Sequence, residues 1–156
     1  LRDSSFTNSK NSNLIEWLKV YDFLNNEGYH VIILDDFENV AIENSKNEIN
    51  KLNQFKFANL DIRARLALYE KAYINLCVNN GTAQLLNYSK YCKFISFKHY
   101  VNDPLSSSSL ENNEKNTGLN KDDQYPFHNN FQKTIWNPID SYDLIKDEFN
   151  KLIKKL

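Results

Sequence analysis

The amino-acid sequence predicts an α/β domain: a three-layer, Rossmann-like parallel sheet flanked by helices, with a long polar loop before a C-terminal helix. Short apolar runs alternate along the chain with segments of helical periodicity, as expected for parallel strands joined by helical crossovers. The clearest unit spans 61–89 and reads DIRARLALYEKAYINLCVNNGTAQLLNYS. Its pattern predicts a helix, a buried strand, a tight Asn-Asn-Gly turn and a second helix.

Composition limits the classes of function. A chain of 156 residues suits one domain, 1–156. The net charge is −1, with 25% charged residues, so nothing indicates binding to nucleic acid or to an anionic membrane. No run approaches the roughly 20 apolar residues of a transmembrane helix. The two cysteines, Cys77 and Cys92, lie in or beside predicted strands, and we expect them to be free thiols.

Two further expectations concern cofactors and context. The histidines and cysteines lack the spacing of metal ligands, so we expect neither a metal nor another cofactor. The chain begins at Leu1 without an initiator methionine, and we interpret it as the C-terminal half of a larger protein. We expect a cytoplasmic location, with a peripheral association with a membrane left open.

The first third of the chain predicts a helix between two strands. Leu1 is interpreted as the end of a first strand. A helix starts after Asn13, with Glu16 at the capping-box position and Gly28 at its C-terminal end. The apolar run 29–34 (YHVIIL) predicts a central strand, because strands covered on both faces are continuously apolar. A weak helical pattern follows near 46–54.

The rest of the chain predicts two more strands and two more helices. Within the unit 61–89, residues 74–78 form the strand, and a helix begins at Thr82. Residues 93–97 (KFISF) predict another strand. The segment 98–137 is interpreted as a long loop, partly disordered near 104–123, because it has little apolar periodicity. The final helix is expected to start near 140 or 141.

The strongest candidate site is the turn made by Asn79, Asn80, Gly81 and Thr82. Ligands of open α/β sheets bind where a strand ends and the next helix begins. Free backbone N–H groups at such a corner suit a phosphate, and Gly81 would let a ligand approach closely. The alternative is an Asn-Gly hairpin between antiparallel strands. Residues 83–86 do not alternate as a strand would, which favours strand, turn and helix.

Four charged residues are weaker candidates. Arg2 and Asp3 follow the first predicted strand, and an arginine fork suits a diphosphate, although a surface arginine is equally compatible. Asp35 ends the second strand, where a carboxylate can accept ribose hydroxyls. No G-x-G-x-x-G follows the first strand, and a solvated turn is the alternative for Asp35. Arg65 is a candidate phosphate ligand, unless it pairs with Asp61 four residues earlier on the helix surface.

The order of these features resembles the C-terminal, sugar-nucleotide-binding half of GT-B glycosyltransferases, over roughly residues 1–97. The start, 1–3, is similar to the strand end of fucosyltransferase-type enzymes that carries Arg and Asp. The segments 65–72 and 78–82 are similar to their helix, strand and small-residue turn. Heptosyltransferase-like enzymes use a comparable glycine turn near the donor diphosphate. The residues around Arg2 and Gly81 depart from both families, so the donor sugar and nucleotide stay open.

The resemblance implies a glycosyltransferase that moves a sugar from a nucleotide diphosphate sugar to a glycan acceptor without a metal. Arg2 and the turn 80–82 would face the donor diphosphate. The acceptor side and the catalytic base would lie in a missing N-terminal domain, so the fragment alone would be inactive, and no catalytic residue is assigned. Two alternatives stay open: a non-catalytic α/β module that binds a small anion or a protein, and another enzyme on a similar sheet, such as a nucleotide-sugar epimerase or a hydrolase.

Overall fold

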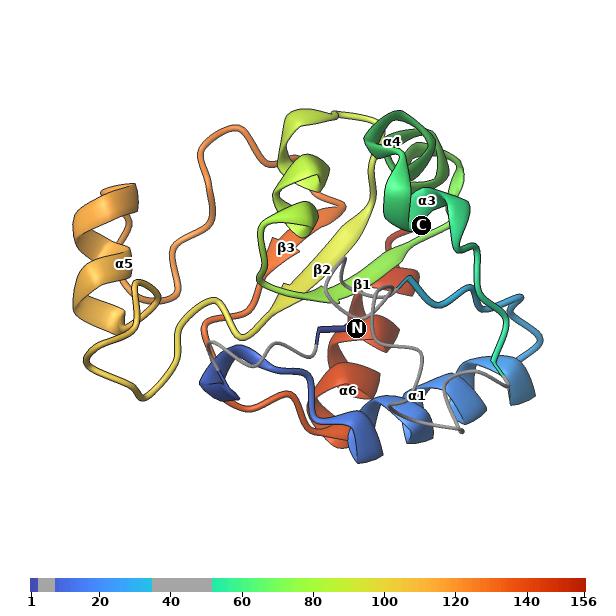
Figure 1. The fold of residues 1–156 in the computed structure, drawn as a ribbon, viewed down its shortest axis with the longest axis horizontal. Helices are drawn as coiled ribbons and strands as arrows, with labels where there is room; N and C mark the ends of the chain where they lie inside the picture. Colours follow the sequence, from blue (N-terminus) through green and yellow to red (C-terminus); the bar gives the residue numbers. More distant parts are fainter. Residues whose placement is uncertain (3–7, 35–51) are drawn as a thin grey trace.

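The computed structural model describes residues 1–2, 8–34 and 52–156. The predictions for Asp3, for Asp35 and for most of the helix near 46–54 therefore fall outside the described residues. Within them the chain is α/β, with a parallel sheet flanked by helices, an arrangement consistent with a Rossmann-like fold (Figure 1). The helical elements are η1 (Asn8–Lys10), α1 (Leu14–Asn26), α3 (Phe57–Leu60), α4 (Ile62–Lys71), η3 (Thr82–Tyr88), α5 (Leu110–Thr117) and α6 (Tyr142–Ile153).

The sheet has three strands in the order β1-β2-β3: β1 (Asn75–Val78), β2 (Phe94–Phe97) and β3 (Gln132–Thr134). Both pairs are parallel, with Asn75 opposite Phe94 in the first and Phe94 opposite Gln132 in the second. The strands predicted at 74–78 and 93–97 are confirmed. The hairpin alternative for the turn after β1 is excluded, because the residues that would form its second strand, Thr82–Tyr88, are helical.

Helices α1 and α6 pack together against one face of the sheet (Figure 1). The shared core consists of buried apolar side chains from both helices and from β1 and β2: Trp17, Val20, Leu24, Val78, Ile95, Phe97, Ile145, Phe149 and Leu152. Ile145, Phe149 and Leu152 form the buried face of α6 within this core, and they fix α6 beside α1. The stability of the sheet therefore depends on contacts between the two ends of the chain.

A second core lies between β2, α4 and η3. It contains Tyr69, Ala83, Leu86, Cys92 and Phe94. Phe94 belongs to this cluster while its neighbour Ile95 belongs to the first, because successive side chains of a strand point to opposite faces. The apolar run of β2 is thus explained by burial on both faces. Cys77 and Cys92 are free thiols, as predicted.

The predicted helix starts are confirmed, although one cap differs. Asn13 precedes α1 without capping it by its side chain. The carboxylate of Glu16 accepts hydrogen bonds from Tyr142 N (2.7 Å) and Lys19 Nζ (2.6 Å), so it serves the contact with α6 and not a capping box. Ser141 caps α6, accepting from Leu144 N at 3.4 Å.

The central strand predicted at 29–34 is not formed. In this segment only Ile33 makes a bridge, parallel to Gln54, with Ile33 N donating to Asn53 O at 2.7 Å. A strand needs a ladder partner along its length, and no described strand pairs with this segment over several residues. Its apolar side chains instead line a cavity described below. They are shielded without being part of a strand, so the continuous apolar pattern led to a wrong prediction of a strand.

The loop predicted at 98–137 contains two regular elements, so that prediction is wrong in part. Helix α5 is capped by Ser109, which accepts from Asn112 N at 3.3 Å, and it ends at Gly118 with a left-handed φ of 72°. Strand β3 is polar, and Gln132 anchors it by donating to Ser89 O (2.9 Å) and Cys92 O (3.0 Å). Polar anchors of this kind leave no apolar periodicity in the sequence. Partial disorder near 104–123 stays a prediction.

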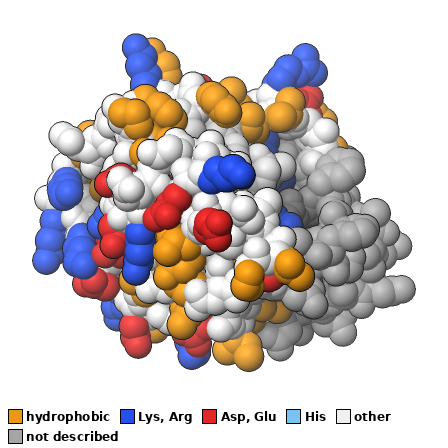
Figure 2. All heavy atoms as spheres, turned by 90° about the vertical axis from the view of Figure 1, so that its left-hand side faces the viewer, with side chains coloured by type: hydrophobic (Ala, Val, Ile, Leu, Met, Phe, Trp, Pro, Cys, Tyr) orange, Lys and Arg blue, Asp and Glu red, His pale blue; other side chains and the backbone are white. Residues whose placement is uncertain are grey.

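The surface carries charges of both signs. On the face shown in Figure 2, basic and acidic side chains are interspersed with apolar ones. This agrees with the net charge of −1. None of the described helices has the length and apolar character needed to cross a bilayer.

Candidate functional site

The turn Asn79–Thr82 lies at the carboxyl end of β1. Asn79 N donates to Phe97 O at 2.8 Å and so extends the pairing with β2 by one step. The side chain of Asn80 then closes the turn, since its Oδ1 accepts from Ala83 N (2.8 Å) and Thr82 Oγ1 (3.0 Å). The predicted strand, turn and helix are therefore present, with a 3₁₀ helix, η3, as the helical element.

Gly81 occupies ordinary helical backbone, with φ −56° and ψ −46°. A Cβ placed on it would meet no heavy atom within 4 Å of the described chain. Neither the backbone conformation nor packing therefore requires glycine at this position. The predicted reason for it, close approach of a ligand, stays a prediction.

Arg65 supports this turn from α4. Its guanidinium donates from Nη1 to Thr82 Oγ1 (2.8 Å), from Nη2 to Asn59 Oδ1 (3.0 Å) and from Nε to Ala58 O (2.9 Å). The residue is only 4% exposed. Arg65 therefore contacts the predicted turn, but it does so through protein groups, as a brace for Thr82.

The surface pair considered between Asp61 and Arg65 is not formed. Asp61 caps α4 by accepting from Arg63 N (2.8 Å) and Ala64 N (3.2 Å). Its carboxylate also pairs with Arg63 Nη2 at 3.1 Å. The hydrogen bond from the Arg63 side chain, followed by those from the two backbone N–H groups, lowers the pKa of Asp61. Arg63 is thus the arginine that pairs with Asp61 at the surface, whereas Arg65 is buried.

A series of hydrogen-bonded polar side chains leads away from Asn79. Its Oδ1 accepts from Gln84 Nε2 at 2.6 Å, and Gln84 Oε1 accepts from Asn87 Nδ2 at 2.9 Å. Asn87 Oδ1 lies 2.8 Å from His128 Nε2. Asn79 Nδ2 also donates to His99 O at 3.4 Å. The end of β1 is thus linked to the residues that follow β2 and to the segment before β3.

His99 and His128 are held in an aromatic environment. The His99 ring packs edge-on to Trp136 at 4.3 Å and contacts Tyr125 at 5.8 Å, and Tyr125 contacts His128 at 5.1 Å between ring centroids. Burial lowers the pKa of both histidines to about 4, and for His99 the charge of His128 adds to this effect. His99 Nε2 and His128 Nδ1 are buried without a hydrogen-bond partner among the described residues. Both rings are therefore neutral at pH 7.

The carboxyl end of β2 is joined to the loop before α1 through Lys98 and Asp140. Lys98 Nζ donates to Asn11 O at 2.6 Å and lies 3.5 Å from Asp140 Oδ1. Asp140, which is 2% exposed, accepts from Trp17 Nε1 (2.6 Å) and from Asn13 N (2.9 Å). A buried carboxylate with these partners fixes the loop 8–13 at the carboxyl edge of the sheet.

Arg2 is attached to the same loop. Its backbone N donates to Ser12 Oγ and its carbonyl accepts from Ser12 N, both at 2.9 Å. Burial, followed by the positive charge of Arg2, lowers the pKa of Lys10, so two cations share this part of the loop. Of the predicted site residues, the structure thus joins Arg65, Asn80 and Thr82 directly. That Arg2 lies beside the turn stays a prediction.

Sequence reasoning missed Lys98, His99 and Asp140. A signal was present for the first two, since Lys98 and His99 directly follow β2 just as Asn79 and Asn80 directly follow β1. The rule that singled out the turn applies equally to the neighbouring strand. Asp140 carried no local signal, because its partners are distant in the sequence: Asn13 and Trp17 lie more than a hundred residues before it, and Lys98 lies in another element.

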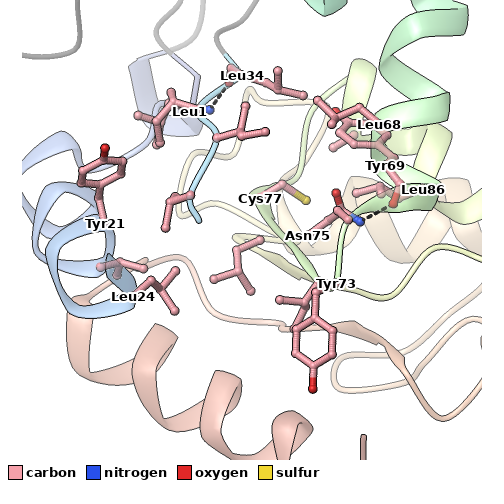
Figure 3. Close-up of a pocket in the computed structure, with 18 of the residues that line it drawn as sticks. Leu1, Tyr21, Leu24, Leu34, Leu68, Tyr69, Tyr73, Asn75, Cys77 and Leu86 are labelled. Carbon is pink, nitrogen blue, oxygen red and sulfur yellow. Dashed lines mark hydrogen bonds between the residues drawn. The ribbon is translucent and has the colours of Figure 1, made fainter. Parts of the chain in front are cut away.

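A cavity of about 410 Å³ lies along β1, on the side away from β2. Leu1 and Leu34 lie at one end of it and Tyr73 at the other, with Cys77 and Asn75 along the side formed by β1 (Figure 3). Arg65, Asn80 and Thr82 also contribute to its lining, which is otherwise mainly apolar. Burial raises the pKa of Cys77 to about 11, so this thiol is protonated at neutral pH.

Among the described residues, no group of three or more histidine, cysteine, aspartate or glutamate side chains is arranged to hold a metal ion. No protein-family model matches the chain, and no similar protein is found among curated proteins or solved structures.

Proposed function

We propose that this chain is the donor-binding half of a GT-B-type glycosyltransferase, which transfers a sugar from a nucleotide diphosphate sugar to a glycan. One observation carries the proposal: the polar turn Asn79–Thr82 lies at the carboxyl end of a parallel strand and is braced from behind by buried Arg65. Ligands of open α/β sheets bind outside these strand ends. A complete three-layer Rossmann-like domain is part of the proposal.

The proposed position of the donor diphosphate follows from the groups available at this edge. The Thr82 hydroxyl is used internally, because it donates to Asn80 and accepts from Arg65. The backbone N–H groups of Gly81 and Thr82 make no hydrogen bond within the described chain. These two donors would bind the diphosphate, and the Arg2 guanidinium would neutralise the charge that develops as the sugar leaves.

Three elements of the proposal rest on the resemblance to the GT-B enzymes. The acceptor glycan and the catalytic base belong to an N-terminal domain, so the half seen here binds the donor without turning it over. The leaving diphosphate is stabilised by protein groups without a metal. The cytoplasm is the proposed location, since sugar nucleotides would be the donors.

The test is calorimetric titration of the full-length protein with GDP-, UDP- and ADP-sugars. We expect one of them to bind and Arg2→Ala to weaken binding at least about tenfold, which is the loss of about 1.4 kcal/mol expected for a charge-assisted contact. Arg63→Ala is the matched control, because the same side chain is removed from an exposed position. Absence of binding by all three donors, or equal binding by Arg2→Ala, would overturn the proposal.

A non-catalytic anion-binding module is the second candidate. It is favoured by the proximity of Arg2 and Lys10, two cations that suit an anion of any kind. The two candidates differ in what is bound. A binding module would take inorganic pyrophosphate as tightly as any sugar nucleotide and would show no sugar transfer, whereas the donor site would prefer one nucleotide.

A further inference from the structure

The cavity beside β1 separates two segments that run in the same direction. Tyr29, at the start of segment 29–34, stacks on Tyr73, just before β1, with ring centroids 6.1 Å apart. Leu34, at the other end of the segment, lies at the opposite end of the cavity from Tyr73 (Figure 3). The segment 29–34 and β1 are therefore aligned side by side, but they are separated by the cavity along their length.

The edge of β1 that faces the cavity has unused backbone groups. Asn75 N and Asn79 N donate to the β2 side, to Lys93 O and Phe97 O. Because successive residues of a strand alternate in direction, the N–H groups of Leu76 and Val78 point away from β2. No described strand pairs with this edge. Val78 is buried and Leu76 is half-buried, and backbone donors removed from water are costly unless something pairs with them.

Both faces of the cavity are already covered. Trp17, Val20 and Leu24 of α1 line one face, and Leu68, Tyr69 and Leu86 of α4 and η3 line the other. A position that has apolar side chains above and below and backbone groups at its edges is the environment of a central strand in a parallel sheet.

The strand order leaves one place empty. Gln54 bridges Ile33, the cavity follows, and β1, β2 and β3 complete the sheet. Helix α1 lies with α6 on one face, whereas η3 lies on the other. Doubly wound sheets reverse their winding in this way and have the order 3-2-1-4-5-6. In this order, segment 29–34 corresponds to strand 2, because it follows α1, and β1 corresponds to strand 4. The cavity between them therefore lies at the position of strand 1.

Leu1 is located at this place. It lines the cavity, and its amine donates to Leu34 O at 2.7 Å, a backbone contact of the kind made between neighbouring strands (Figure 3). Strand 1 of such a sheet leads directly into the loop before the first helix. Arg2 already pairs with Ser12, just ahead of α1, so Leu1 lies where such a strand would end.

We propose that the cavity is the slot for the central strand of the sheet, and that its occupant is an extended apolar segment of the same polypeptide leading into Leu1. The segment pairs with Leu76 and Val78 on one edge and with 31–34 on the other, and it turns 29–34 into the strand that its sequence predicts. The cavity and the strand order carry this assignment, whatever the length of the chain ahead of Leu1.

The test compares three versions of the protein that differ only in six residues added before Leu1. The first addition is Val-Thr-Val-Ile-Ile-Val, a strong strand former. The second is an equally long Gly-Ser segment, and the third is the first with Pro at two alternate positions, which removes backbone donors. Hydrogen–deuterium exchange of Leu76 and Val78 is the readout, with Ile95 at the centre of β2 as the internal reference.

We expect the strand-forming addition to slow exchange at Leu76 and Val78 by at least about tenfold, with Ile95 little changed, and the other two additions to have no such effect. Equal exchange in all three proteins would overturn the proposal. If the first version aggregates, the same six residues are supplied as a free peptide to the unextended chain. The proposal then requires the peptide to slow exchange at Leu76 and Val78. Protection of Leu76 and Val78 by a sugar nucleotide in the Gly-Ser version, together with loss of its binding in the strand-forming version, would show that the ligand occupies the cavity and would also overturn the proposal.

Discussion

The guanidinium group of Arg65 donates a hydrogen bond of 2.8 Å to the hydroxyl oxygen of Thr82, joining helix α4 to the turn after β1. The same group binds Asn59 and Ala58 O, so one side chain connects α3, α4 and the turn. A buried arginine used in this way sets the position of Thr82 without needing to touch a ligand. Its removal should affect folding first and ligand binding second.

Arg65→Ala should lower the free energy of unfolding by at least about 3 kcal/mol, because two buried acceptors and the half-buried Thr82 hydroxyl lose their donor. Arg65→Lys should recover only part of this, since an ammonium group cannot reproduce the planar fork. Urea unfolding followed by circular dichroism measures both. Arg63→Ala is the control and should leave the transition midpoint nearly unchanged, because Arg63 is 89% exposed. Equal losses at both positions would contradict the bracing role.

Lys98 and Asp140 should be energetically coupled. Asp140 also accepts from Trp17 and Asn13, so Asp140→Ala should cost about 3–5 kcal/mol by leaving these buried groups unpaired. A double-mutant cycle of Lys98→Met with Asp140→Asn isolates the ion pair, and a coupling of about 1 kcal/mol or more is expected.

The matched control for that cycle is Lys151→Met with Asp147→Asn, an exposed i,i+4 pair on α6. Its coupling should be indistinguishable from zero, because solvent screens exposed charges. A Lys98–Asp140 coupling that is equally small would show that burial of this pair does not strengthen it.

The parts of the fold that the sequence predicted are those set by local patterns. The start of the final helix near 140 or 141 and the apolar run of β2 are both readable within one element, and each is confirmed. Gly28 at the end of α1 has a left-handed φ of 86°, as its place after the helix predicts. Periodicity therefore located the elements that pack through a continuous apolar face.

The parts that were missed depend on partners distant in the sequence. Strand β3 is polar, and its anchor Gln132 binds carbonyls about forty residues away. From the sequence, Arg65 could pair with Asp61 on the helix surface. In the structure Asp61 caps α4 and pairs with Arg63 instead. Segment 29–34 has the composition of a central strand, but among the described residues it makes only one bridge, from Ile33 to Gln54. Local propensity cannot report a missing or distant partner.

His99 should make the protein less stable as the pH falls. Burial lowers its pKa in the folded protein to about 4, whereas the unfolded chain has an ordinary value near 6.5. Below pH 6.5 the unfolded state therefore binds a proton that the folded state does not, and stability decreases until the pH reaches about 4. For this residue, 3% exposed, the loss across that interval is up to about 3 kcal/mol.

His99→Phe should reduce this dependence without abolishing it, since it keeps an aromatic ring against Trp136 and removes one titrating group while His128, whose pKa is also lowered to about 4, remains. Unfolding free energies measured in urea at pH 5 and pH 7 give the comparison. His30→Phe serves as the control, because His30 is exposed and should leave the slope unchanged. A slope in His99→Phe as steep as in the unaltered protein would contradict the prediction and would assign the whole dependence to other groups, with His128 the first candidate.

The two glycines Gly28 and Gly81 should respond differently to alanine. Gly28→Ala should cost about 1–2 kcal/mol, because an L-residue is strained at its φ of 86°. Gly81→Ala should be neutral or stabilising by up to about 1 kcal/mol, since its backbone is helical and a Cβ meets nothing within 4 Å. Thermal unfolding of the two variants measures this contrast.

Gly81→Ala also separates folding from binding. If the donor diphosphate contacts the N–H groups of Gly81 and Thr82 as proposed, the added methyl group should weaken sugar-nucleotide binding at least about tenfold in a protein that is fully folded. Calorimetry on Gly81→Ala, with Gly28→Ala as the variant altered far from the turn, gives the result. Unchanged affinity in Gly81→Ala would place the ligand away from this turn, because a ligand bound to these N–H groups would meet the added methyl group.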